Sequence, residues 1–128
     1  MMQMFPVAGE IALAGEFAGP ADAPIILFLH GGGQTRHAWR ATAHMIARHG
    51  FRALCIDQRG HGDSDRDPSG AYDMDMFAAD VRALLATVPN IISIIGASLG
   101  GMASLLALGD RDEQTACPSL VLVDIAHR

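Results

Sequence analysis

The sequence predicts an α/β protein with a mostly parallel sheet that carries helices on both faces. Two observations support this fold class: four short apolar runs, and helix-like segments that alternate with them. The runs are rich in β-branched residues and are apolar at successive positions, which is typical of strands buried on both faces. The alternation favours right-handed crossovers between parallel strands. The runs are "IILFL" at 25–29, "ALCI" at 53–56, "IISII" at 91–95 and "LVLVDI" at 120–125.

Three helices are predicted between these strands. The first covers 35–49, with Thr35 as its N-cap and a glycine directly after its end. The second covers 73–88, where Asp73 lies at the positive N-terminal end and a proline follows the last residue. The third covers 99–108. Ahead of the first apolar run, "EIALAGEFAG" alternates weakly and predicts an antiparallel strand or hairpin at the sheet edge.

Length and composition predict one soluble domain. The chain has 128 residues, half of them hydrophobic, which is enough to bury a core. The net charge of −5 and the scattered arginines argue against a nucleic-acid or anionic-membrane partner. No secretory signal is recognisable, and no apolar run approaches the roughly 20 residues of a membrane helix, so a cytoplasmic location is expected. Cys55 and Cys117 match no metal or redox spacing, and Cys55 is expected to be a buried free thiol.

The stretch "GASLG" at 96–100 matches G-x-S-x-G, the pattern of a nucleophilic serine on a sharp strand-to-helix turn. Such a turn strains the serine backbone, and only small residues at Gly96 and Gly100 avoid a clash. The turn would raise the hydroxyl of Ser98 above the sheet and aim the N–H of Leu99 at a reacting carbonyl oxygen. The alternative interpretation is a small-residue turn that lets helix and sheet pack closely.

A second turn, "LFLHGGGQT", places three glycines between a strand and a helix. Its exposed backbone N–H groups could bind an anion or stabilise developing negative charge. The stretch fits neither nucleotide-binding glycine pattern, since it lacks the lysine of a P-loop and has Arg36 where G-x-G-x-x-G needs its third glycine. No nucleotide or other cofactor is therefore expected.

A third turn, "IDQRGHGDSDRDPSG", carries acidic residues at alternate positions. A calcium loop starting at Asp63 would need glycine at its sixth position and glutamate at its twelfth, where the sequence has Pro68 and Met74. No metal site is predicted. The stretch is interpreted as a connecting loop in which Asp57 holds the turn and Arg59 pairs with a nearby carboxylate.

Together, these three turns resemble the α/β-hydrolase superfamily, which carries them after its third, fourth and fifth strands. The resemblance covers roughly residues 9–126 and implies the strand order 1-2-4-3-5-6. It implies that Ser98 is the nucleophile, that the backbone amides of Leu99 and Gly32 form the oxyanion hole with Gly33 as an alternative donor, and that His30 braces the oxyanion turn. The implied activity is that of a serine hydrolase (an esterase, lactonase or perhydrolase-like enzyme) that transfers an acyl group from a small ester-like substrate to Ser98.

The resemblance also implies what residues 1–128 lack. Family members usually carry their acid after a seventh strand and their histidine after an eighth, so the chain is expected to be the N-terminal part of one hydrolase domain, truncated after the sixth strand, without cap or C-terminal strands. None of the six histidines, including His61 and His127, stands at the position of the general base. Asp124 is a candidate acid, because some members carry the acid after strand six; the alternative is a structural aspartate.

We therefore expect this chain alone to be catalytically incomplete. Its last strand would form an exposed apolar edge that favours self-association or pairing with a C-terminal half. The alternative functions are a non-catalytic hydrolase-fold fragment, or a ligand-binding protein, that pairs with a partner through this edge.

Overall fold

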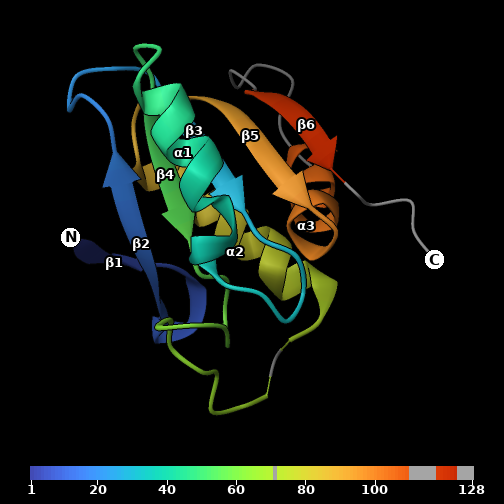
Figure 1. The fold of residues 1–128 in the computed structure, drawn as a ribbon. Helices are drawn as coiled ribbons and strands as arrows, with labels where there is room; N and C mark the ends of the chain where they lie inside the picture. The colour runs from blue at the N-terminus through green and yellow to red at the C-terminus, as the bar shows by residue number, and fades with distance from the viewer. Residues whose placement is uncertain (71, 110–117, 124–128) are drawn as a thin grey trace.

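A single six-stranded sheet forms the centre of the computed structural model, which describes residues 1–70, 72–109 and 118–123 (Figure 1). The strand order is β1-β2-β4-β3-β5-β6, as the resemblance implied. The β1–β2 and β2–β4 pairs are antiparallel, and the β4–β3, β3–β5 and β5–β6 pairs are parallel. The strands are β1 (Met2–Pro6), β2 (Ala12–Ala18), β3 (Ile25–Leu29), β4 (Arg52–Ile56), β5 (Ile91–Ala97) and β6 (Ser119–Val123).

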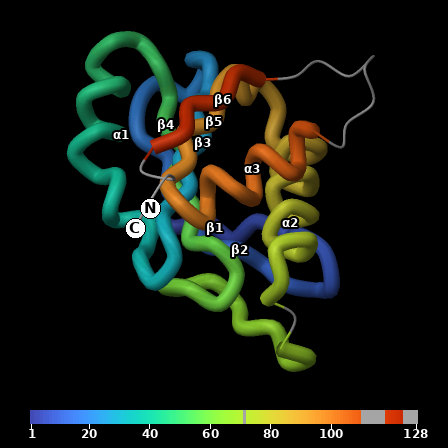
Figure 2. Tube along the Cα trace, turned by 90° about the vertical axis from the view of Figure 1, so that its right-hand side faces the viewer, coloured from blue at the N-terminus to red at the C-terminus, as the bar shows by residue number. Residues whose placement is uncertain are grey.

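Helices cover both faces of the sheet, which confirms the predicted fold class. Figure 2 shows α2 (Met74–Thr87) and α3 (Leu99–Gly109) side by side on one face, with α1 (Arg40–Ala47) on the other. Short 3₁₀ turns, η1 (Ala8–Glu10) and η2 (Arg36–Trp39), precede β2 and α1. Within the described ranges, no helix has the length and apolar character needed to cross a lipid bilayer.

The helix predicted over 35–49 is shorter than expected and begins differently. Its first turn is the 3₁₀ turn η2, in which the hydroxyl of Thr35 accepts a hydrogen bond from the N–H of His37 at 3.3 Å. The N–H of Arg36, which has no acceptor inside the helix because it lies in the first turn, donates to the carboxylate of Asp57 at 2.6 Å. This tertiary contact fixes the entry to the helix, and a regular α-helix forms only from Arg40 onward.

The core lies on both sides of the central strands. The larger apolar cluster joins Leu27, Leu29, Leu54 and Ile56 to α2 and α3. The smaller cluster, beneath α1, is built on Phe28, Ala53 and Cys55. Cys55 is a buried free thiol, as expected, and burial raises its pKa to about 12. Because successive residues of β3 and β4 enter different clusters, these strands are apolar throughout.

The strand β6 lies at the end of the sheet order and exposes an apolar surface. Val121 is 49% exposed, and Leu122 and Val123 are exposed as well. The prediction of an open apolar edge is therefore confirmed for the described residues. The last two residues of the predicted strand, 124 and 125, lie outside the described residues.

Candidate active site

Ser98 stands at the junction of β5 and α3 with a strained backbone. Its φ is +49°, in the left-handed region that non-glycine residues adopt only at a cost of about 1–3 kcal/mol. Two backbone hydrogen bonds stabilise this conformation. The N–H of Ser98 donates to the carbonyl of Val123 in β6 at 3.2 Å, and the carbonyl of Ser98 accepts the N–H of Met102 at 2.9 Å. The residue is exposed, so its hydroxyl is accessible.

Gly96 and Gly100, two residues before and after Ser98, lie too close to backbone atoms for a side chain to fit. A Cβ added at Gly96 would lie 2.7 Å from the carbonyl carbon of Gly100. A Cβ added at Gly100 would lie 2.5 Å from the carbonyl oxygen of Leu29 in β3. Each partner is backbone and cannot move aside as a flexible side chain could, so the spacing of small residues in "GASLG" reflects close packing of α3 on the sheet.

The turn of three glycines lies directly beside this bend. A Cβ on Gly31 would be 3.5 Å from the Cβ of Ser98, and one on Gly32 would be 4.0 Å from the Cβ of Leu99. In the described part of the chain, neither the Gly32 nor the Leu99 N–H donates a hydrogen bond. The N–H groups of Gly32 and Leu99 are therefore both without an acceptor, and the two residues lie close together beside the exposed Ser98.

His30 contacts the turn of three glycines from inside the protein. Its ring is fully buried; Nδ1–H donates to the carbonyl of Gly31 at 2.7 Å, and Nε2 accepts the N–H of Gln58 at 2.9 Å. The Gln58 amide also donates to the His30 carbonyl at 2.7 Å. Burial lowers the pKa of His30, which favours the neutral ring. Both ring nitrogens are occupied, so His30 is a positioning residue and has no free nitrogen for use as a base.

His61 holds the same turn from the neighbouring loop, a contact that the sequence did not reveal. Its Nε2 accepts the N–H of Gly33 at 3.1 Å, and its Nδ1–H donates to the carbonyl of Arg59 at 2.9 Å. Its ring also lies 4.8 Å from that of His30. The N–H of Gly33 is thus already engaged, which leaves Gly32 with the open donor. Parallel strands place their following loops at one sheet edge, and this rule was the available signal for the contact.

Replacing His61 by alanine is expected to release the Gly33 amide. Without its acceptor, the Gly33 N–H should exchange with solvent at least tenfold faster in hydrogen-exchange NMR, since the turn is otherwise exposed. The Gly100 N–H, which donates to the His30 carbonyl at 3.2 Å, serves as the internal control and should be much less affected. Equal acceleration at both amides would instead indicate general loosening of the site.

The loop after β4 is a structural network, as the sequence interpretation expected. Asp57 accepts the N–H of Arg36 at 2.6 Å and that of Asp63 at 2.9 Å, and it forms an ion pair with the Arg36 guanidinium. Burial alone would raise the pKa of Asp57, but these donors outweigh burial and hold it below its usual range. The fully buried Arg59 donates to both carboxylate oxygens of Asp80, at 3.0 and 2.8 Å, and to Asp67 at 2.6 Å.

The acidic residues of this loop are hydrogen-bonded to protein groups. Asp65 accepts the N–H of Ala12 at 2.9 Å, and Asp63 and Asp67 pair with arginines. Among the described residues, no three histidine, cysteine or acidic side chains are arranged to hold a metal ion. His37, His44 and His49 are exposed around α1, as expected. Asp124, His127 and Cys117 lie outside the described residues.

Comparison with known proteins agrees with this arrangement. A family model described as the alpha/beta hydrolase fold matches residues 24–128. The chain belongs to this family. Non-heme chloroperoxidase of Streptomyces lividans is 39% identical over 84 residues, which cover 65% of this chain and 30% of that protein. The sn-1-specific diacylglycerol lipase ABHD11 of Mus musculus is 36% identical over 113 residues, covering 84% of this chain and 34% of the lipase.

Solved structures of alpha/beta hydrolases superpose on most of the chain. A hydrolase from Pseudomonas aeruginosa PA01 has a TM-score of 0.73 and 31% identity over 85% of this chain and 41% of its own. An esterase from Exiguobacterium antarcticum has a TM-score of 0.83 over 95% of this chain and 44% of its own, and at 22% identity it supports the fold alone. The chain therefore spans less than half the length of the relatives it matches.

Proposed function

We propose that this chain supplies the nucleophile and the oxyanion hole of a serine hydrolase that acts on small ester-like substrates. The observation that carries the proposal is the strained, exposed Ser98 held beside the open N–H groups of Gly32 and Leu99. The alpha/beta hydrolase relatives include proteins named as a lipase, esterases and chloroperoxidases, which supports an ester-like substrate. An esterase, lactonase or perhydrolase-like activity fits this arrangement.

In the proposed reaction, the hydroxyl oxygen of Ser98 attacks the carbonyl carbon of the ester. The carbonyl electron pair moves onto oxygen, where the N–H groups of Gly32 and Leu99 would stabilise the negative charge. Collapse of this intermediate expels the alcohol and leaves an acyl group on Ser98, and water then releases the acid. A base must take the serine proton and return it to the leaving alcohol, because an unassisted serine hydroxyl is a weak nucleophile.

The described residues do not offer that base. His30 and His61 lie near the turn, but both ring nitrogens of each are engaged in hydrogen bonds. We therefore propose that the histidine and acid come from outside the described residues, with Asp124 as one candidate acid, and that the 128-residue chain alone turns over little ester. In assays of p-nitrophenyl acetate, the chain and its Ser98→Ala variant should hydrolyse at the same rate.

Fluorophosphonate labelling tests the nucleophile. In a protein in which this chain is completed by the proposed histidine and acid, the probe should modify Ser98, and Ser98→Ala should abolish the label. Ser93→Ala is the matched control, because Ser93 lies in β5, the strand that leads into the bend, and its hydroxyl accepts a hydrogen bond from that of Ser119 at 2.9 Å. This variant should retain the label. Label that survives Ser98→Ala in a folded protein would overturn the proposal. Multiple turnover by the 128-residue chain, lost in Ser98→Ala, would overturn the proposed incompleteness.

The exposed strand β6 supports a second candidate, a fragment that pairs with another chain through its sheet edge. The parallel edge carries Val121, Leu122 and Val123 in exposed positions, and such an edge is a template for pairing. A concentration-dependent dimer in size-exclusion chromatography, lost when Val121 is replaced by lysine, would support this candidate. A stable monomer at high concentration would argue against self-association.

A further inference from the structure

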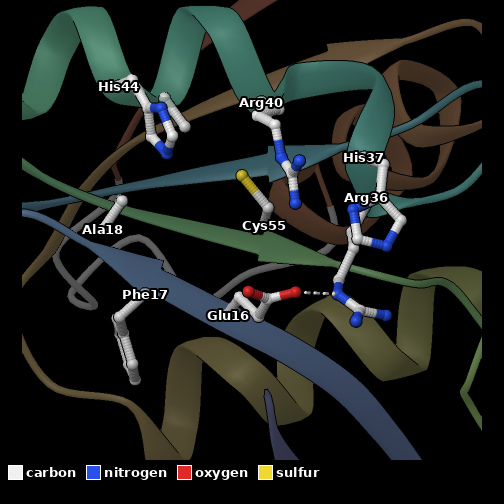
Figure 3. A pocket seen from close by; sticks show the side chains of 9 residues that line it. Glu16, Phe17, Ala18, Arg36, His37, Arg40, His44 and Cys55 are labelled. Carbon is white, nitrogen blue, oxygen red and sulfur yellow. Dashed lines mark hydrogen bonds and ion pairs between the residues drawn. The ribbon is translucent and has the colours of Figure 1, made fainter. Parts of the chain in front are cut away.

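A cavity of about 110 Å³ lies between α1 and the strands β2 and β4 (Figure 3). None of its lining residues belongs to the serine bend or to the turn of three glycines. Its walls combine charged and apolar groups: a guanidinium from α1, an ion pair opposite it, and an apolar floor. The cavity is therefore a separate feature of the molecule with its own chemistry.

Arg40 lines the cavity as a solvent-exposed cation without an ion-pair partner among the described residues. Its side chain extends from the first turn of α1 into the cavity, above Cys55 and facing β2 (Figure 3). Within the part of the chain that the structure describes, the Arg40 guanidinium forms neither an ion pair nor a hydrogen bond. A guanidinium presents several N–H donors in one plane, a geometry that suits a carboxylate.

The opposite wall of the cavity contains an ion pair between Glu16 and Arg36. Glu16 accepts the Nε–H of Arg36 at 2.8 Å, and this hydrogen bond lowers the pKa of Glu16. Arg36 is further neutralised by Asp57 and Asp63. Of the two arginines that line the cavity, Arg40 is thus the one without an ion pair. The charged Glu16 disfavours a ligand with a second negative charge.

The floor of the cavity suits a short aliphatic group. Ala18 and Phe17 of β2, Ala43 of α1 and the thiol of Cys55 form its apolar parts. Because burial raises the pKa of Cys55 to about 12, the thiol stays uncharged at neutral pH and does not repel an anion. His44 lies at the α1 side of the cavity and offers a further polar contact (Figure 3).

We propose that this cavity binds a short-chain monocarboxylate. The carboxylate lies on the Arg40 guanidinium beside His44, and the aliphatic end packs over Cys55 and Ala18. A single charge-assisted contact at a partly open site corresponds to binding in the millimolar range. Acetate and propionate fit this description, whereas phosphate is excluded by its second charge and by the apolar floor.

A ¹H–¹⁵N NMR titration of the 128-residue protein at pH 7 and constant ionic strength tests this site, with sodium acetate, sodium propionate and inorganic phosphate as probes. Acetate and propionate should produce saturable shifts at Ala18, Ala43, Cys55 and the Arg40 side chain, and phosphate should not. Arg40→Gln should weaken acetate binding at least tenfold. Arg48→Gln is the matched control, because Arg48 is an exposed arginine just after the same helix and outside the cavity.

A second variant keeps the result interpretable if Arg40→Gln disturbs α1. Ala18→Leu fills the apolar end and leaves the arginine in place, so it should weaken propionate more than acetate. Shifts that fail to saturate, that persist unchanged in Arg40→Gln, or that phosphate reproduces would overturn the proposal. None of these measurements depends on Ser98 or on hydrolysis.

Discussion

The Gly100→Ala substitution is expected to lower the free energy of unfolding by about 3 kcal/mol, near the upper end for overpacking in a protein core. The added Cβ would lie 2.5 Å from the carbonyl oxygen of Leu29 and 2.7 Å from its carbonyl carbon. Since these atoms belong to the backbone of β3, the clash is relieved only if α3 moves away from the sheet. Urea unfolding followed by circular dichroism measures the loss.

Gly109→Ala is the matched control in the same helix. A Cβ at Gly109 would meet no atom of the described residues within 4 Å, and this glycine stands at the last position of α3. Alanine has a higher helix propensity than glycine by up to about 1 kcal/mol, so the control should be neutral or slightly stabilising. A similar loss in both variants would show that contact with β3 is not the cause.

Replacing Arg59 by methionine is expected to destabilise the protein by about 3–5 kcal/mol, the usual range when one partner of a buried ion pair is removed. The Arg59 side chain is fully buried, and that of Asp80 is 5% exposed. Methionine fills much of the volume but leaves the Asp80 carboxylate without its two charge-assisted hydrogen bonds. Asp67, whose side chain is 11% exposed, also loses its bond to Arg59 but keeps those from the N–H and the hydroxyl of Ser69.

The pH dependence of this variant identifies the cause. Burial already raises the pKa of Asp80, and Arg59 opposes that rise. In Arg59→Met the folded-state pKa of Asp80 therefore lies further above its unfolded value, so the variant gains stability relative to wild type as the pH falls toward that pKa. The deficit should be smaller at pH 5 than at pH 7, and the double variant Arg59→Met/Asp80→Leu should recover most of it. A pH-independent deficit that the double variant retains would contradict the assignment.

Local patterns were sufficient to predict most of the fold. The helix predicted over 73–88 corresponds to α2, and Asp73 caps it by accepting the N–H of Met76 at 3.0 Å. The helical spacing of its apolar residues, the residue that caps its start and the proline that ends it are all contained in that stretch of sequence. The requirement for glycine at positions 96 and 100 was also predictable, because a strand-to-helix turn creates its own crowding.

The remaining features depend on side chains that meet across the fold. The prediction of one helix over 35–49 was wrong at its start, where a 3₁₀ turn forms and the N–H of Arg36 binds Asp57 in the loop after β4. The contact between His61 and Gly33 likewise joins two loops that a local pattern does not relate. The cavity beside Arg40 exists because one helix lies over two particular strands, and the sequence of the helix alone does not specify which side chains face it.

The hydrogen bond from the N–H of Ser98 to the carbonyl of Val123 determines when the turn at Ser98 can form during synthesis. Val123 is the last residue of β6, so its carbonyl reaches the serine only after that strand has left the ribosome and joined β5. During synthesis, the chain that ends at α3 already contains the serine but lacks this anchor, and the strained backbone must be held by its other contacts. The strained conformation of the turn is thus completed late, by a segment that follows it in the sequence.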